Sequence, residues 1–371
     1  MGTVKVSTHS IDKTTNQRVR SVFNRDNLTA KLNIKPVDPV TLEFSARYSE
    51  TDILGGGAND VSSTLDTDRR LKYSVIFTPI PISNLDASAG SDDDDLGNLY
   101  NPIQAIDDNY REKTRKQLNL AGAATWEVVK GLKAKVEVGY DDYRLNDRRF
   151  WGLTTYYIKN TPASDNQGMP ATRLVNTSRY KVRNTNTINY DFSQLIKNED
   201  HNLNLLVGHE YIIEKQTTLT SENHGFPKTF VAEDAWKLTT QGKAYSIDNN
   251  ISPDDKLLSA FGRVNYDFKG NYILSATFRA DGSSKFSEGN RWGYFPSAAV
   301  AWRISSESFM EVTKNWLTDL KIRASFGTAG NNNIPDGQTV QTYSSSATAW
   351  INGFDSYWAA SKKMANADLK W

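Results

Sequence analysis

The strongest constraint on the fold of this 371-residue chain is a regular alternation of uncharged and charged side chains. In seven segments no even-numbered position is charged, although 23% of the chain is charged. The segments are 28–36, 42–48, 132–140, 260–268, 272–280, 294–304 and 320–326. Between their even positions lie charged side chains such as Lys133, Lys135 and Glu137. Because successive side chains of a strand point to opposite faces, period two predicts β-strands whose two faces meet different solvents.

The strands expected from this pattern are long, and their connections differ on the two sides. About eleven are predicted, many of them longer than the roughly 5–6 residues usual in soluble sheets. They cover about 3–11, 18–36, 40–50, 113–129, 132–149, 179–196, 201–218, 257–268, 271–282, 292–304 and 317–328. Short turns alternate with long polar loops, which is typical of an antiparallel transmembrane β-barrel with long extracellular loops.

The two kinds of connection can be placed on the sequence. Short ones are expected at Pro36–Val40, Lys130-Gly131, 197–201, 269–271 and Ser305–Trp316. Long loops are expected at about 51–112, 150–178, 219–256, 283–291 and 329–367. Leu71–Ile82 has the pattern of a strand, but a crossing there would put 83–112 on the short-turn side. We therefore predict one long external loop over 51–112 that contains a small element of its own.

Aromatic side chains gather near the predicted short turns, on the uncharged face. They are Trp126, Tyr190, Phe192, Tyr266, Phe268, Tyr272 and Trp302. Rings at these positions suit the boundary between lipid and headgroups, so they predict an interfacial girdle. The alternative is that they are ordinary hairpin aromatics that pack on a second sheet, since strands are generally rich in aromatic residues.

Composition excludes several classes of function. The 44 basic and 43 acidic residues balance, so no electrostatic footprint for nucleic acid is present. The chain has no cysteine and therefore no disulfide or thiolate chemistry. No run of about 18 apolar residues predicts a membrane helix, whereas a barrel strand needs only about 9–11 residues with every second one apolar.

Catalytic and metal-binding motifs were sought and none was found. His9, His201, His209 and His224 lack the spacing of metal ligands, and the outward parity of His209 favours an interfacial position. Gly55–Gly57 is read as a flexible loop, because no helix pattern follows it. Asp92–Asp95 is read as a solvated loop, with a Ca²⁺ site as the alternative. We expect neither a cofactor nor an enzymatic activity.

Aromatic residues in the long loops are the better binding candidates. Trp236, Trp350, Tyr357 and Trp358 lie where no hydrophobic pattern surrounds them. Their rings could bind a substrate by stacking on sugar faces, or could anchor a partner protein. The competing interpretation is that they pack the loops against one another, because long loops need small cores of their own.

The last third of the chain resembles the SusC/RagA class of TonB-dependent outer-membrane transporters. The resemblance rests on FGRVNYDFKGNYILSATFRADGSSKF (261–286), WGYFPSAAVAWRISSESF (292–309), LKIRASFGTAGNNNIP (320–335) and NADLKW (366–371). In the last motif Ala367 stands where the class usually has proline. Weaker similarity covers NLTAKLNIKP (27–36) and VVKGLKAKVEVGYD (128–141).

The resemblance implies a location in the cell outer membrane and a barrel of 22 strands closed by a plug. It also implies a SusD-like surface lipoprotein as partner, energy from TonB through the plug, and uptake of an oligosaccharide or a peptide. Residues 1–371 would form part of the barrel domain, in contact with outer-membrane lipid. No leader precedes the first predicted strand, and Trp371 falls where a new strand would begin. We therefore expect a partial receptor without plug or signal peptide.

Two other hypotheses compete with the transporter barrel. A soluble β-sandwich that binds ligands would also show alternation, but it predicts short strands, mixed loop lengths and no girdle. An outer-membrane enzyme would need a nucleophile and a base that converge, and no such pair is visible in the sequence.

Overall fold

The structure is a computed structural model that describes most of the chain. The described residues are 2–11, 18–55, 108–155, 157–158, 168–196, 198–347, 356–361 and 363–371. The predicted element at Leu71–Ile82, like most of the loop over 51–112, lies outside them.

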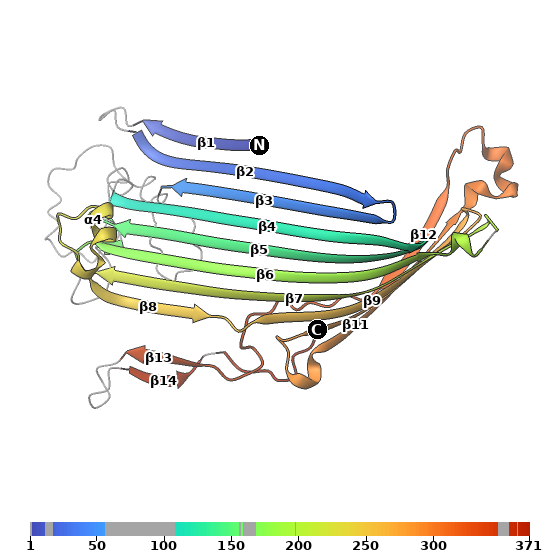
Figure 1. Cartoon of the computed structure of the whole chain (residues 1–371). Coiled ribbons are helices and arrows are strands. Elements are labelled where there is room, and N and C mark those ends of the chain that lie inside the picture. Colours follow the sequence, from blue (N-terminus) through green and yellow to red (C-terminus); the bar gives the residue numbers. More distant parts are fainter. Residues whose placement is uncertain are drawn as a thin grey trace.

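One antiparallel sheet dominates the molecule, and its strands follow one another in sequence order (Figure 1). Twelve strands belong to it: β1 (Gly2–Ile11), β2 (Arg18–Val37), β3 (Val40–Leu54), β4 (Asn109–Val129), β5 (Leu132–Trp151), β6 (Ala171–Asp191), β7 (His201–His224), β8 (Lys243–Ile251), β9 (Asp255–Phe268), β10 (Tyr272–Ser283), β11 (Trp292–Arg303) and β12 (Lys321–Gly327). Eleven of them form a path from β1 to β12, and β8 pairs with β7 beside that path. The path matches the eleven strands predicted from the sequence.

Short elements fill the connections. A separate hairpin joins β13 (Tyr343–Ala347) to β14 (Ser356–Ala360). A short α-helix, α4 (Ala232–Lys237), lies between β7 and β8. The 3-10 turns are η1 (Phe192–Gln194), η2 (Thr239–Gln241), η3 (Glu288–Asn290), η4 (Ile304–Ser306) and η5 (Ser308–Thr313). Within the described residues, no helix has the length and apolar character needed to cross a membrane.

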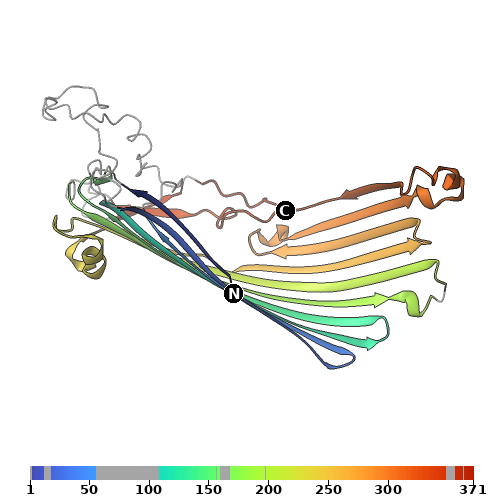
Figure 2. The same ribbon diagram turned by 90° about the horizontal axis from the view of Figure 1, so that it is seen from above.

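The sheet is open, and its two edge strands do not pair with each other. The path has β1 at one end and β12 at the other, and Figure 2 shows one continuous, twisted layer. The open sheet agrees with the partial barrel that the resemblance implies. It also shows that the soluble β-sandwich was the wrong alternative, because the long strands do not divide into two packed sheets.

The strand register keeps the uncharged positions on one face across the whole sheet. Cross-strand partners point to the same side. One row of partners runs through Ile34, Leu42, Ala124, Val136, Asn186, His209, Ala260, Ala280 and Tyr294. The parity changes from even to odd on β7 and returns to even on β9. We call this side the apolar face and the opposite side the charged face.

One predicted outward residue is misplaced, because a bulge shifts the register near the turn between β2 and β3. Ile34 pairs with Leu42, but the next pair is Val37 with Val40. The extra residue moves Val37, which is 57% exposed, into the position expected for Pro36. Proline is tolerated at such a bulge because it has no N–H to contribute to the ladder.

Several strands extend further into the long loops than expected, and others end earlier. The predicted loop at 219–256 holds the end of β7, α4 and β8, while β6 begins at Ala171 inside the loop predicted over 150–178. Residues 192–196 belong to a turn, and β12 begins at Lys321 rather than at 317. Beyond the lipid-facing band both faces of a strand are polar. The hydrophobic alternation therefore fades there while the backbone ladder continues.

The turns at the opposite end are tight and contain residues with left-handed backbone conformations. Lys269 has φ 56° and Gly270 has φ 69° in the turn between β9 and β10. Asp267 accepts the backbone N–H of Gly270 at 2.6 Å, which fixes this turn. The ends of the strands are thus distinct: a short-turn end and a long-loop end.

The predicted aromatic girdle lies at the short-turn end. The ring of Tyr272 stacks with that of Trp302 at 6.3 Å between centroids and lies 6.2 Å from that of Phe268. His201 Nδ1 lies 2.7 Å from the hydroxyl of Tyr266. Trp302 also donates to Glu307 at 2.9 Å, which lowers the pKa of that carboxyl. The rings at the start of β7 and on β9 to β11 therefore form a connected belt near the turns.

Buried hydrophobic residues occur in two small clusters at the long-loop end, on opposite faces. On the charged face Trp151, Tyr157, Ile158 and Ala171 pack together. On the other face Phe150 and Phe226 pack with Ala235 of α4. Phe150 and Trp151 are neighbours in β5, so their side chains leave the sheet in opposite directions. Each cluster fixes a loop against its own side of the strands.

Candidate functional site

The charged face forms a continuous wall of paired charges along the strands. Some of its pairs join neighbouring strands, which the register brings opposite each other, some join two positions of one strand, and one reaches across β9 from β10 to β7. The pairs include Lys135–Glu137, Arg183–Glu137, Lys181–Glu214, Arg111–Asp147, Lys113–Asp147, Arg279–Glu210 and Arg279–Asp281. Most of these side chains are part-exposed, so the charged face presents hydrated hydrogen-bond donors and acceptors to a molecule that contacts it.

Arg279 is the centre of the densest cluster on this wall. Its guanidinium donates to Glu210 at 3.0 Å, to Ser259 at 2.7 Å and to Asp281 at 2.7 Å. The same group lies 5.3 Å from the ring centre of Phe261. Ser259 is fully buried, whereas 34% of the Arg279 side chain is exposed. The cluster is therefore anchored in the wall and open on one side.

The charges of this cluster do not balance locally. One guanidinium faces two carboxylates, those of Glu210 and Asp281. Glu210 also accepts from the hydroxyl of Thr185 at 3.1 Å. The surplus of negative charge favours cationic or hydroxyl-rich groups over anionic ones at this point of the wall.

A second ion pair stiffens the wall near the long-loop end. Arg111 binds both carboxylate oxygens of Asp147, at 2.7 and 2.5 Å, and Lys113 lies 3.3 Å from the same group. Both members of the bidentate pair are almost fully buried. A planar guanidinium that grips a carboxylate at two points fixes its geometry. This pair supports the wall rather than presenting a free group.

An aromatic stack closes the charged face at the same end. Trp151 stacks on Tyr157 at 4.2 Å, and Tyr245 stacks on His224 at 3.9 Å with an angle of 8° between the rings. The Tyr157 hydroxyl donates to Glu222, whose carboxylate lies 3.0 Å from His224 Nε2. Burial raises the pKa of Tyr157, and its bond to Glu222 raises it further. The phenol stays protonated and holds the loop on the strands.

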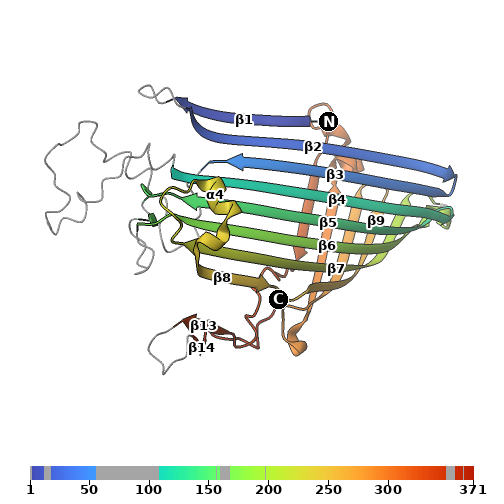
Figure 3. The same cartoon turned by 60° about the vertical axis from the view of Figure 1, so that its left-hand side comes forward.

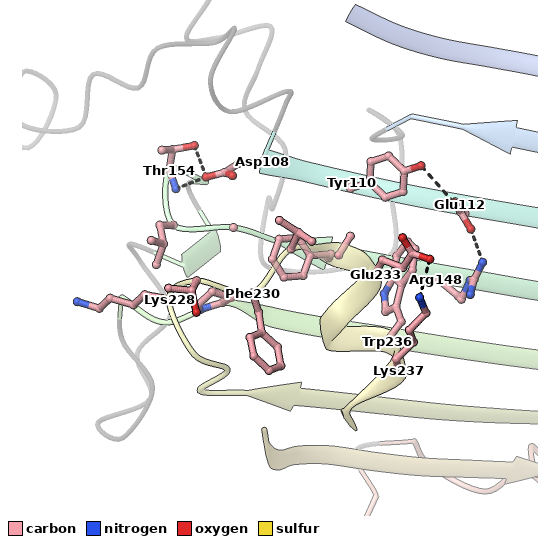
Figure 4. A pocket seen from close by; sticks show the side chains of 17 residues that line it. Asp108, Tyr110, Glu112, Arg148, Thr154, Lys228, Phe230, Glu233, Trp236 and Lys237 are labelled. Carbon is pink, nitrogen blue, oxygen red and sulfur yellow. Dashed lines mark hydrogen bonds and ion pairs between the residues drawn. The ribbon is translucent and has the colours of Figure 1, made fainter. Parts of the chain in front are cut away.

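Trp236 lies on the other side of the sheet, in a cavity of about 740 Å³ between α4 and strands β4 and β5 (Figure 4). Figure 3 shows α4 lying across that face of the strands, near their long-loop ends. The Arg148 guanidinium lies 4.6 Å from the Trp236 ring centre, and Tyr110 lies 5.6 Å away. Lys237 pairs with Glu233 at 2.8 Å at the rim. The ring is partly buried within a loop core.

The four aromatic residues predicted to bind a substrate or partner do not come together in the described part of the chain. Trp236 packs against the outer side of the sheet, and Trp350 lies outside the described residues. For Tyr357 and Trp358 the structure gives only their places in β14. Their role in binding stays a prediction.

The Arg279 cluster was not singled out in the sequence, although the alternation over 272–280 puts Arg279 on the charged face. Glu210 lies 69 residues from Arg279, and only the register of β7, β9 and β10 brings them together. The sequence offered one signal for this cluster: Glu210 and Arg279 lie on the same face and at a similar depth in the predicted strands. Across the described residues, no group of three or more His, Asp or Glu side chains could hold a metal ion.

The geometry defines the class of fold first: the chain is part of the wall of an antiparallel transmembrane β-barrel. Comparison with known proteins agrees. Two TonB-dependent receptors of Formosa agariphila, P3 and P26, are 29% and 28% identical over 75% and 92% of this chain. The receptor SusC of Bacteroides thetaiotaomicron is 40% identical over 31% of it. No family model matches the sequence.

A solved structure shows the same fold. The RagAB peptide transporter superposes with a TM-score of 0.73 at 21% identity, over 95% of this chain and 37% of that one. The chain therefore resembles SusC/RagA-type TonB-dependent receptors, over part of their barrel. It spans 26% of P3 and 32% of P26.

Proposed function

We propose that the receptor to which this chain belongs imports an oligosaccharide or a peptide across the outer membrane. The observation that carries the proposal is the two-faced sheet: from β2 to β12 the register keeps a band of uncharged side chains on one side and paired charges on the other. A lipid-facing exterior and a wet, polar lumen are the arrangement a large transport barrel requires. The charged face lines the passage in this proposal.

The remaining parts of the transporter are proposed from the similarity of this chain to the SusC/RagA class. Residues 1–371 belong to the barrel domain, and the plug and the contact with TonB belong to other parts of the receptor. A SusD-like lipoprotein covers the long-loop end and delivers the substrate. The relatives are named as receptors and the structural neighbour as a transporter, which supports transport rather than catalysis.

Uptake in whole cells tests this function. A strain without the receptor gene is supplied with labelled oligosaccharides or labelled peptides as separate arms, and accumulation is measured with and without TonB. We expect one arm to lose uptake in both the receptor and the TonB deletions. If neither arm responds to deletion of the receptor, the import function is wrong.

A lumenal substitution then links the passage to this wall. Arg279→Met removes the cation from the cluster with Glu210 and Asp281 and should change the uptake rate at least several-fold. Arg263→Met on the same face is the matched control, because Arg263 makes one exposed hydrogen bond to Thr277 at 3.2 Å. If both variants took up substrate at the same rate, the Arg279 cluster would not act in the transport passage.

A further inference from the structure

Two hollows lie on the apolar face, one beyond the other along strands β4 and β5. The apolar hollow, of about 470 Å³, lies within the uncharged band and spans β2 to β5. The polar hollow, of about 480 Å³, lies nearer the long-loop end and spans β4 to β7. Along β4, Leu120 of the first and Lys116 of the second are four residues apart, which is about 13 Å in a strand. A lipid of one leaflet, whose acyl chains cover half of a hydrocarbon core about 30 Å thick, is long enough to reach both.

The outward side of the sheet changes from apolar to polar between the two hollows. On β4 and β5, the partners Leu120 and Tyr140 of the apolar hollow are followed, two rows further on, by the partners Lys116 and Arg144 of the polar one. On β6 the change falls at the same rows, because Ser178 is the partner of Arg144. The boundary between acyl chains and headgroups is therefore expected between the hollows.

Small side chains leave the apolar hollow open. The residues that line it include Ala30, Phe44, Ala46, Leu120, Gly122 and Val138. A Cβ added at Gly122 would meet only the Phe44 ring, at 3.5 and 3.6 Å, which is ordinary contact. The fold therefore does not require a glycine at this position of β4. Glycine inside a strand often marks the close approach of another molecule, and an acyl chain suits a hollow lined by hydrocarbon.

Two cations with spare hydrogen-bond donors line the polar hollow. Among the described residues, Arg144 is bonded through Nε alone, to Asp142 at 3.2 Å, and 71% of its side chain is exposed. Lys116 Nζ lies 2.9 Å from Glu50, and 52% of the lysine side chain is exposed. The two terminal nitrogens of the Arg144 guanidinium are thus left for a ligand. A planar guanidinium fork of this kind binds a phosphate at two points.

Amide and hydroxyl groups lie beside the two cations. Asn146 of β5 is the partner of Asn176 of β6, and Ser178 lies between Arg144 and Thr217 in the next row. Within the described part of the chain, no hydrogen bond engages the side chains of Asn146, Asn176, Ser178 or Thr217. Amides and hydroxyls both donate and accept, as the hydroxyl groups of a sugar require. The polar hollow therefore suits a headgroup that carries one anion and several hydroxyls.

We propose that the two hollows form one binding site for an outer-leaflet lipid whose headgroup is a phosphorylated saccharide. An acyl chain lies in the apolar hollow, the phosphate meets Arg144 and Lys116, and the sugar hydroxyls meet the amides and hydroxyls between β5 and β7. Glu50 and Asp142 already pair with the two cations, so a bare phosphate gains little there and the sugar and acyl contacts are needed. The inference rests on the outer-membrane location of the receptor and not on what it imports, so uptake can fail while the lipid site stands.

Native mass spectrometry of the full-length receptor in nonionic detergent tests the site. The probe is monophosphoryl lipid A, and dioleoylphosphatidylcholine is the comparison lipid, because it carries a phosphate but no sugar. We expect the receptor to retain the probe with an affinity about tenfold or more above that for the comparison lipid. Arg144→Gln combined with Asn146→Ala should weaken binding of the probe about tenfold or more. Gly122→Leu, which fills the apolar hollow, should weaken it to a similar extent.

Each variant has a matched control on the same face. Lys256→Gln removes an exposed cation from β9, where Lys256 is the partner of the outward Ile213 and lies outside both hollows. Ala276→Leu adds bulk to the outward side of β10, also outside both hollows. Neither control should change binding of the probe by more than about twofold. Lys116→Gln is a milder headgroup variant that keeps the test possible if the double variant does not fold.

The outcomes separate the possible occupants. Equal retention of the two lipids by the wild-type receptor would overturn the proposal, and so would losses in the two controls as large as those in the site variants. Unchanged binding in Gly122→Leu and in the headgroup variants would also overturn it. Free glucosamine 1-phosphate should not displace the probe at equal concentration. If it does, the polar hollow takes a soluble phosphosugar, and the lipid is the wrong ligand.

Discussion

Lys135 and Val136 are neighbours in β5, yet their side chains meet opposite environments. Val136 is 50% exposed on the apolar face, whereas Lys135 pairs with Glu137 at 3.1 Å on the charged face. We therefore expect Val136→Arg to destabilise the receptor by about 2–4 kcal/mol, as an arginine does in mid-membrane on a barrel's lipid face. Urea unfolding of the full-length receptor in lipid vesicles, followed by tryptophan fluorescence, measures this loss.

The matched change on the other face is Lys135→Ala. It removes a part-exposed ion pair, which contributes about 0–1 kcal/mol. If both variants lost the same stability, the assignment of faces on β5 would be incorrect.

Arg279 should matter to stability more than a neighbouring arginine on the same face. Arg279→Met leaves Glu210 and Asp281 without their shared cation, and we expect a loss of about 1–3 kcal/mol, since hydrogen bonds to charged groups are the stronger ones. Arg263→Met should cost less than about 1 kcal/mol, because its bond to Thr277 is exposed. Unfolding curves at low and high salt should show the Arg279 effect shrinking as salt screens the two carboxylates. A salt-independent loss would point to packing against Phe261 instead.

Tyr157 gives a prediction about pH. Tyr157→Phe removes the hydroxyl that donates to Glu222, with an expected loss of about 1–3 kcal/mol at pH 7. The pKa of Tyr157 is raised in the folded protein, so its phenol contributes stability fully below the usual tyrosine pKa of about 10 and loses it as pH rises further. The gap between wild type and variant should be constant from pH 7 to 9 and narrow above pH 10. A gap that already narrows below pH 9 would contradict the raised pKa.

The lipid-facing wall could be predicted from the sequence because one physical rule governs it. Residues 132–140 of β5 and 272–280 of β10 alternate strictly, so Val136 and Ala276 were placed on the correct face by counting alone. The bulge that moves Val37 into the place of Pro36 has no such signal, because it depends on how two strands meet at a turn. Counting by two therefore fails wherever the ladder slips by one residue.

The sites at the long-loop end could not be predicted from the alternation of apolar and polar residues. There both faces are polar, so the ends of β6 and β7 and the whole of β8 had no alternation to reveal them. The bond from Tyr157 to Glu222 joins a loop to a strand 65 residues away. Trp236 was recognised as a loop aromatic, but nothing in its sequence neighbourhood indicates that α4 packs on the outer face.

Trp236 should hold its loop on the strands, whatever else it binds. Trp236→Ala removes a ring packed against Arg148 and Tyr110, so α4 should detach more often and trypsin should cut faster at Lys228 and Lys237. Trp316→Ala is the control, because Trp316 is 75% exposed at the short-turn end. If Trp236→Ala reduced substrate uptake without speeding up tryptic cleavage, the predicted role of Trp236 in binding would be favoured instead. Limited proteolysis of the receptor in detergent, read by mass spectrometry, distinguishes the two.

Spin labels can test the two faces on strands far from β5. The outward positions Val300 of β11 and Ala276 of β10 lie on paired strands, opposite Leu274 and Ala298, and Ser297 and Ser275 leave the same strands on the charged side. Oxygen dissolves in hydrocarbon, whereas a charged nickel chelate stays in water. Labels at Val300 and Ala276 should therefore be relaxed by oxygen, and labels at Ser297 and Ser275 by nickel, in the full-length receptor reconstituted in bilayers. Ala276 and Ser275 are adjacent in sequence, so a general loosening of β10 would affect both labels alike. It would not make one label accessible to oxygen and the other to nickel. The reverse pattern, or equal access at all four positions, would remove the assignment of the apolar face to lipid.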